Sequence, residues 1–169
     1  MIPITVYIFL LIQLIAVSYI DLVQRRISNY WILLNIIFFI GFLFLMGDYY
    51  QLKFETFFYS LVFFFVGFLL FQLKIMGGGD SKYLFSFYLL IPVSLHESAF
   101  SALVYSTIIV GLSVFFLNIF KNRAKIKKAI VEKNLKSIKF IFGSKFPFSP
   151  VVLFSWIWFG WENWGKIFF

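Results

Sequence analysis

The sequence predicts an all-α fold, a polytopic membrane helix bundle with six transmembrane helices and both termini outside. Three properties lead to this class: 62% of the 169 residues are hydrophobic, only 13% are charged, and the mean hydropathy is +0.95. Soluble domains are about 45 to 50% apolar. Here the apolar residues form blocks of 13 to 21, the length class of membrane-spanning helices. A water-soluble fold is therefore excluded.

Six intervals of low polarity give the candidate helices. No Lys or Arg precedes the first, and positive charges follow it, which indicates a retained anchor with its N-terminus outside rather than a cleaved signal. The fourth has only 13 residues and covers about 20 Å, whereas the hydrocarbon core is about 30 Å thick, so its crossing needs a separate argument. The intervals are Pro3–Ile20, Tyr30–Met46, Thr56–Leu73, Tyr83–Leu95, Phe100–Phe120 and Phe148–Trp161.

The basic residues supply that argument. If all six segments cross, one side carries 13 basic residues and the other side carries 2, Lys53 and Lys166. A fourth segment that did not cross would place the most basic loop opposite the other basic loops, against the positive-inside tendency. We therefore expect six crossings of the cytoplasmic (inner) cell membrane. The 13 cytoplasmic residues are Arg25, Arg26, Lys74, Lys82, Lys121, Arg123, Lys125, Lys127, Lys128, Lys133, Lys136, Lys139 and Lys145.

Residues 1–169 are expected to form a single transmembrane domain, with residues 121–145 as a basic cytoplasmic loop. This loop is interpreted either as an amphipathic helix lying on anionic lipid or as a docking site for a substrate. A net charge of +8 would suggest nucleic acid in a soluble protein, but its position indicates membrane lipid as the partner and no nucleic acid. With no cysteine and a single histidine, His96, no metal site or other cofactor is expected.

The carboxylates fall into two groups. Five are expected in water, at outer loops and helix ends or within the basic loop: Asp48, Glu55, Glu97, Glu162 and Glu132. Asp21 directly follows the first apolar run at its cytoplasmic end, and Asp80 begins the fourth helix on the same side, behind three glycines. Although 59 positions separate these two, both are expected at the same depth, so a bundle could bring them together. Four tryptophans are expected to form an outer aromatic belt: Trp156, Trp158, Trp161 and Trp164.

Each of the two aspartates also has a structural interpretation. Asp21 could pair with Arg25 one helical turn later, or reach the lipid headgroups. Asp80 could be the N-cap of the fourth helix, with Gly77 to Gly79 allowing the chain to turn. The functional interpretation is a carboxylate pair, in which one group holds a proton while the other polarises a water molecule, as in aspartic proteases.

Two motifs carry a family resemblance. Residues 76–82, Met-Gly-Gly-Gly-Asp-Ser-Lys, resemble the G-x-G-D-x-K signature of the type IV prepilin peptidase family, which are GxGD-type membrane aspartyl proteases. Residues 21–29, Asp-Leu-Val-Gln-Arg-Arg-Ile-Ser-Asn, resemble that family's first-aspartate motif, D-x-x-x-x-R-I-P-N. The two motifs occur in the family's order, each at the mouth of a helix, and Ser28 stands where the family usually has proline.

The resemblance implies an aspartic endopeptidase that removes the short basic leader of prepilins or prepilin-like secretion proteins at the cytoplasmic membrane face. Asp21 and Asp80 would be catalytic, one as general base toward water and the other as general acid, without metal, nucleotide or covalent intermediate. The family's larger members carry a cysteine-containing region associated with methylation of the new N-terminus. This chain has no cysteine and no room for that region, so it resembles the short, peptidase-only form. The sequence predicts no particular oligomeric state.

Other residues of the motifs have supporting interpretations. Gly77 and Gly79 would allow a close backbone approach and positive φ just before Asp80. Lys82 could tune the pair or contact a phosphate headgroup. Arg26 and Asn29 match positions of the first motif, and Asn29 is interpreted as the cap of the second helix.

Three other classes of protein are alternatives. A proton-coupled transporter would place its carboxylates near the bilayer midplane, whereas both aspartates here lie at helix ends. A presenilin-like protease resembles the chain only around Gly77 to Asp80, and its second, proline-containing motif is not found. A non-catalytic pilus assembly factor is the third alternative, and an assay of leader removal from a prepilin-like reporter would separate all of them.

Overall fold

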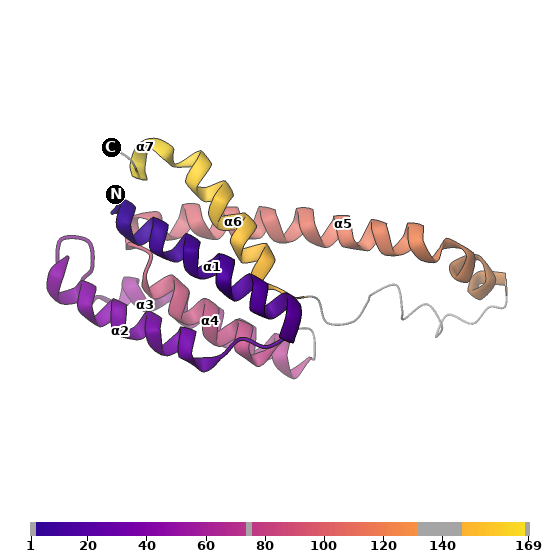
Figure 1. Cartoon of the computed structure of the whole chain (residues 1–169), viewed down its shortest axis with the longest axis horizontal. Coiled ribbons are helices and arrows are strands. Elements are labelled where there is room, and N and C mark those ends of the chain that lie inside the picture. Colours follow the sequence, from indigo (N-terminus) through magenta and orange to yellow (C-terminus); the bar gives the residue numbers. More distant parts are fainter. Residues whose placement is uncertain (1–2, 74–75, 132–146, 168–169) are drawn as a thin grey trace.

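The computed structural model describes residues 3–73, 76–131 and 147–167, and within them the regular structure is entirely helical. Figure 1 shows the helices running roughly alongside one another, with α5 extending well beyond the others. The elements are α1 (Ile4–Gln24), α2 (Asn29–Leu45), α3 (Phe54–Gln72), α4 (Gly78–Leu89), the 3₁₀ turn η1 (Val93–Leu95), α5 (His96–Val131), α6 (Ser149–Glu162) and α7 (Trp164–Ile167).

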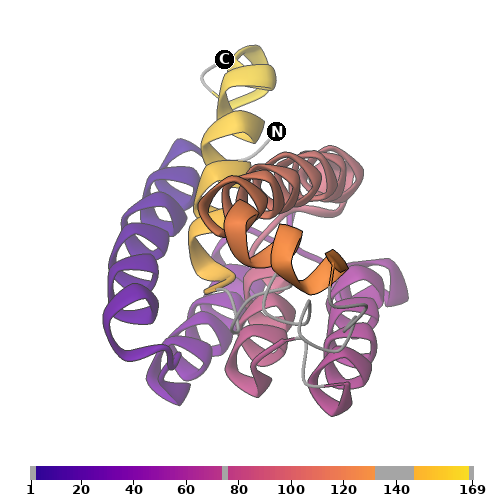
Figure 2. The ribbon, with the colours of Figure 1, turned by 90° about the vertical axis from the view of Figure 1, so that its right-hand side faces the viewer.

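The bundle has two layers of three helices. In one layer α6 lies between α1 and α5, and in the other α4 lies between α2 and α3 (Figure 2). The central helices are also the shortest of the six, with 12 residues in α4 and 14 in α6. Protein surrounds a central helix on more sides than a peripheral one, so it need not match the thickness of the lipid by itself. This position accounts for the short fourth segment.

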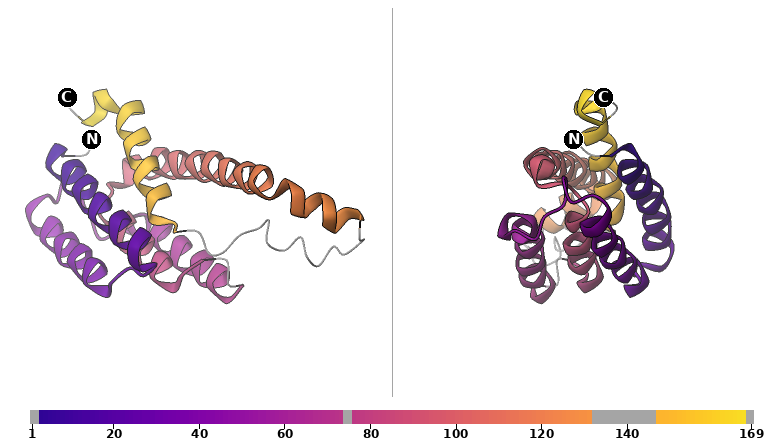
Figure 3. Two further views of the ribbon diagram at one scale, coloured as in Figure 1. Left: turned by 45° about the vertical axis from the view of Figure 1, so that its right-hand side comes forward. Right: turned by 90° about the vertical axis from the view of Figure 1, so that its left-hand side faces the viewer.

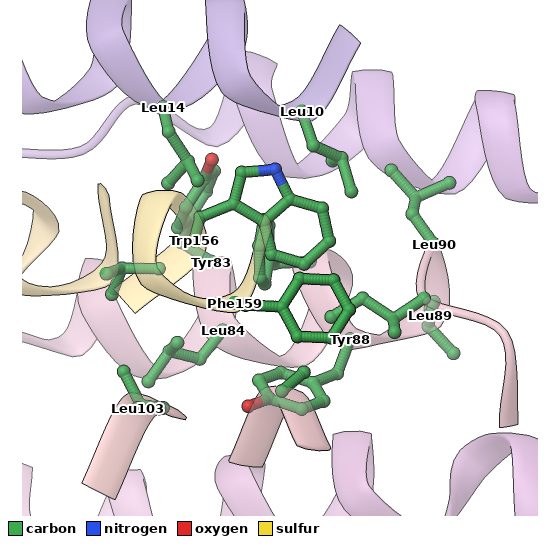
Figure 4. Packing of buried hydrophobic residues seen from close by; sticks show 14 of the residues in the cluster. Leu10, Leu14, Tyr83, Leu84, Tyr88, Leu89, Leu90, Leu103, Trp156 and Phe159 are labelled. Carbon is green, nitrogen blue, oxygen red and sulfur yellow. The ribbon is translucent and has the colours of Figure 1, made fainter. Parts of the chain in front are cut away.

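Large apolar side chains fill the space between the two layers. Trp156 of α6 is 2% exposed and meets Phe87 of α4 edge-on, with ring centroids 5.2 Å apart, while Tyr7 of α1 stacks on the same indole. Figure 4 shows this cluster around Trp156 and Phe159. Trp156 therefore belongs to the core, and its expected place in an outer aromatic belt is wrong, because the inward face of α6 needs an apolar side chain. Trp161 and Trp164 are exposed.

Two glycines let the helices approach closely. A Cβ at Gly160 of α6 would clash with the ring of Tyr7, and one at Gly67 of α3 would clash with Ser81 of α4. Gly67 thus brings α3 directly against the first turns of α4, one residue beyond Asp80. Small residues at helix interfaces serve this purpose in membrane proteins, where apolar burial does not drive association.

The helices fit a membrane protein. Three stretches are long and apolar enough to cross a bilayer, Ile4–Gln24, Phe54–Gln72 and Val93–Arg123, and the shorter apolar helix Asn29–Leu45 adds to them. Figure 3 shows that α1 begins and α6 ends at the same end of the bundle, which we call the termini end. Six crossings with both termini outside stay a prediction.

Glycine and proline account for the differences between the expected and observed ends of the fourth helix. The fourth helix was expected over Tyr83–Leu95 but covers Gly78–Leu89, because the glycines form its first turn instead of a loop before it. Pro92 follows and cannot donate a backbone hydrogen bond, so the chain turns there and continues in η1. The fifth helix is longer than expected and includes the first part of the basic loop, residues 121–131. The rest of that loop, residues 132–145, lies outside the described residues.

Candidate functional site

Asp21 lies in the last turn of α1 and is almost completely buried, with 4% of its surface exposed. Its Oδ2 accepts a hydrogen bond from the backbone N–H of Ser149, the first residue of α6, at 3.3 Å. The N-terminus of a helix carries unsatisfied N–H groups and a partial positive charge, both of which favour a carboxylate. The start of α6 therefore supports a carboxylate that burial alone would disfavour.

Asp21 and Arg25 are joined through their backbones. The alternative interpretation had expected their side chains to pair. Arg25 ends α1 in the left-handed conformation, with φ of 53°, and its N–H donates to the Asp21 carbonyl oxygen at 2.8 Å. No ion pair joins their side chains in the part of the chain that the structure describes. The carboxylate of Asp21 instead turns toward α6, so its position is set by the tertiary fold.

Asp80 lies in the first turn of α4, in the third helical position, and is half-buried. Its Oδ2 accepts a hydrogen bond from the N–H of Gly77 at 3.0 Å, and its own N–H donates to the Gly77 carbonyl oxygen at 3.1 Å. Asp80 does help to close the start of the helix, as the capping interpretation expected, but from inside the first turn. The N-cap position belongs to Gly77.

The bundle brings the two aspartates to one pocket of about 230 Å³. Its walls come from the end of α1, the turn that follows it and the glycine segment before Asp80. We call this end of the bundle the aspartate end. The lining residues are Asp21, Arg25, Arg26, Ile27, Gly77, Gly78, Gly79 and Asp80. The first motif and the second motif, 59 positions apart in the chain, thus face each other.

Gly77 and Gly79 allow close packing of the backbone against neighbouring groups. The positive φ that was expected at them is not found. Gly77 is extended, with φ of −76° and ψ of 144°, and Gly79 lies within α4. A Cβ at Gly77 would lie 2.8 Å from Oδ2 of Asp80, and one at Gly79 would lie 3.3 Å from both Cβ and the carbonyl oxygen of Ile27. The absence of a side chain at Gly79 therefore lets the second motif contact the first. Positive φ is found instead at Arg25, in the first motif.

Two other motif residues lie away from the pocket. Lys82 is exposed and does not line it, an arrangement that fits contact with headgroups better than tuning of the aspartates. Asn29 is the first residue of α2 and is exposed. The cap of α2 is Ser28, whose Oγ accepts the N–H of Tyr30 at 3.3 Å. The serine that replaces the family's proline thus gains a capping role, and the expected cap at Asn29 is wrong.

Sequence reasoning missed the contributions of Ser149 and Ile27. Ser149 is 1% exposed, and Pro150 behind it marks the start of a helix in the sequence. Nothing local shows that this helix begins beside Asp21, 128 positions earlier in the chain. Ile27 lies inside the first motif, but its role as the surface against which Gly79 packs depends on the fold.

Chemically, the site offers two carboxylates in different surroundings. Asp21 is buried and Asp80 is half-buried, and each accepts an N–H from the start of a central helix. Two acidic groups that share one pocket can hold a single proton between them and so act as acid and base. Among the described residues, no three His, Cys, Asp or Glu side chains gather to hold a metal ion.

The comparisons with known proteins give one match. The model of a family described as the type IV leader peptidase family matches residues 8–121, more than half of the chain. The matched segment includes both motifs and excludes α6. Comparisons with curated proteins and with solved structures give no match.

Proposed function

Because the chain belongs to the type IV leader peptidase family, we propose that it is a membrane aspartyl endopeptidase that uses Asp21 and Asp80. Its substrates would be prepilins or prepilin-like secretion proteins, from which it removes the short basic leader. The observation that carries the proposal is the common pocket of the two aspartates, which are distant in sequence but line the same 230 Å³ space. The other carboxylates of the described residues are exposed.

The reaction is the hydrolysis of one peptide bond. One aspartate accepts a proton from water as the water oxygen attacks the carbonyl carbon, and the other donates a proton to the leaving nitrogen as the C–N bond breaks. The pair ends with the same number of protons with which it began. Two acid–base groups must be held at a fixed separation. The close packing of Gly79 on Ile27 supports this chemistry, because it holds the segment of Asp80 against the segment that follows Asp21.

We place the pocket at the cytoplasmic face of the cell membrane, in a bundle that crosses six times with both termini outside. The asymmetry of 13 basic residues against 2 supports this topology, as does the common end at which α1 begins and α6 ends. A substrate that inserts its apolar helix into lipid would then present its leader junction at the depth of the aspartates. Reporter fusions after Lys128 should give a cytoplasmic signal and fusions after Phe169 an external one.

We further propose that the chain cleaves without methylating its product, since the 169 residues contain no cysteine. Mass spectrometry of the mature substrate, made by purified protein in the presence of a methyl donor, should show a free N-terminal amine. A methylated terminus would contradict this part of the proposal.

The central experiment is cleavage of a prepilin-like reporter by the full chain in lipid vesicles. The expected result is a shortened product cut on the cytoplasmic side of the reporter's apolar segment, and its loss in Asp21→Asn and Asp80→Asn. A wild-type chain that binds the reporter but never shortens it would overturn the proposal.

A further inference from the structure

Four buried polar side chains form a closed ring that connects α1, α2 and α4. The Tyr83 hydroxyl donates to Oε1 of Gln13 (3.1 Å), and Nε2 of Gln13 donates to Oδ1 of Asn35 (2.6 Å). Nδ2 of Asn35 donates to Oγ of Ser86 (3.1 Å), which donates back to the Tyr83 carbonyl oxygen (3.0 Å). None of the four is more than 3% exposed. We call this set the polar ring.

Polar side chains are costly inside an apolar bundle unless each finds a partner. Apolar packing has no preferred direction, so helices held only by it can slide or rotate with small changes in free energy. Hydrogen bonds require a narrow range of distances and angles, and a single buried polar residue can fix the register of packed helices. The polar ring is therefore suited to fix the register of α1 and α4, that is, the position of one helix relative to the other along the axis of the bundle.

The polar ring lies directly inward from the pocket. Gln13 precedes Asp21 by eight residues on α1, about 12 Å of helix, and Tyr83 follows Asp80 by three residues on α4, about one turn. The backbone of α1 packs chiefly on α6, and that of α4 on α3 and α2. The hydrogen bond from Tyr83 to Gln13 thus links directly the two helices that carry the aspartates.

We propose that Gln13 and Tyr83 are positioning residues that hold Asp21 and Asp80 at the separation needed to act on one peptide bond. The catalytic part of this inference rests on the proposed function, whereas the part about helix register does not. Gln13→Leu replaces the side-chain amide with a shorter apolar side chain and removes both hydrogen bonds. Tyr83→Phe removes one oxygen atom and only the direct link between α1 and α4.

The helix register can be measured without activity. Because the chain has no cysteine, a spin-label pair at Val23→Cys on α1 and Lys82→Cys on α4, both exposed positions, reports their separation in nanodiscs. We expect one narrow distance distribution with the polar ring intact and a broadened or doubled distribution with Gln13→Leu or Tyr83→Phe. Ser155→Ala is the matched control, because among the described residues that buried hydroxyl bonds only the Val152 carbonyl oxygen of its own helix.

Cleavage kinetics in unlabelled protein complete the test. Gln13→Leu and Tyr83→Phe should lower kcat at least tenfold and change KM less than twofold, and Ser155→Ala should change neither. A distance distribution as narrow as in the wild type, in both variants, overturns the proposal even if they are less stable to heat. Broadening with unchanged kcat overturns the positioning role. If the wild-type chain cleaves no reporter, the proposed function fails, and the distances alone still decide the register.

Discussion

The two ends of the bundle each have a pocket with carboxylates and basic residues, yet only one has the organisation of a reactive site. The pocket at the termini end has a volume of about 480 Å³, twice that of the other, and is lined by Asp48, Lys53 and Glu55 among others. All three side chains are exposed. At the aspartate end, Asp21 is buried and receives an N–H from another helix.

The difference shows that neither pocket size nor the number of charges identifies the site. Water solvates the carboxylates of the termini end, so they need no partner in the protein. The carboxylate of Asp21 is buried against the start of α6, 128 positions later in the chain. Burial of a charged group costs free energy, which the rest of the fold must offset. That cost is consistent with a function at the aspartate end, and the following substitutions test the comparison in pairs.

The largest effect is expected for the aspartates. Asn keeps the shape of Asp but cannot exchange its proton, so Asp21→Asn and Asp80→Asn should each lower kcat by roughly 10²- to 10⁴-fold in the reporter assay. Because the two act together, the double variant should be no worse than either single variant. Asp48→Asn and Glu55→Gln, in the larger pocket, should retain activity within twofold. A comparable loss in either control would show that the two ends do not differ as we infer.

A valine at Gly79 should have the next largest effect. Its Cβ would press on the Ile27 backbone at 3.3 Å and displace Asp80, and a displacement of about 1 Å can lower kcat about 10²-fold. Gly47→Val at the termini end is the matched control, since a Cβ there meets only the Leu43 carbonyl oxygen at 3.9 Å. Both variants should insert normally, as protease protection in vesicles would show. Full activity of Gly79→Val would mean that the glycine segment is only a linker.

The basic residues of the two pockets give a smaller contrast. Arg26 lines the pocket of the aspartates and Lys53 lines the other. Arg26→Gln should lower kcat/KM by roughly tenfold, because the substitution removes the positive charge from the wall of the pocket that holds the two carboxylates. The loss should shrink at high salt. Lys53→Gln should be unchanged at any salt concentration, and an equal loss there would point to a general effect of surface charge.

The smallest effect on activity is expected for Tyr50→Phe at the termini end. Tyr50 is 2% exposed, and its hydroxyl donates to the Leu90 carbonyl oxygen at 2.7 Å. Loss of this bond should reduce the free energy of unfolding by about 1 kcal/mol, visible as a lower Tm in detergent, with kcat within twofold of wild type. A kcat that fell while Tm stayed constant would show that the termini end takes part in the reaction.

The sequence predicted those parts of the molecule that depend on local chemistry. Apolar runs located the helices, and the two motifs picked out Asp21 and Asp80, which do line one pocket. The ends of α4 were misplaced because glycine can either break a helix or begin one, and the outcome depends on what packs against it. Gly78 and Gly79 form the first turn of α4 here, and Gly79 packs so closely on Ile27 of the first motif that a side chain would be crowded.

The remaining features depend on contacts between distant segments. Trp156 looked like a residue of the membrane interface, because a tryptophan-rich helix end does not reveal which of its faces turns inward. No local signal showed the roles of Ser149 and Gln13, since the role of each is set by a partner on another helix. Single-sequence periodicity reports the faces of a helix but not which face meets which neighbour.

The short central helices have a consequence for how water reaches the pocket. With 12 residues, α4 covers about 18 Å of a hydrocarbon layer about 30 Å thick, which leaves a mismatch of about 12 Å along the axis of the bundle. The helices on either side of α4 are longer, so the lipid need not thin to match α4, and polar backbone at that depth is tolerated only beside protein or water. If the bundle crosses the membrane as we propose, the start of α4 forms the floor of a hydrated depression, where a peptide bond could be hydrolysed without either reactant crossing the apolar interior.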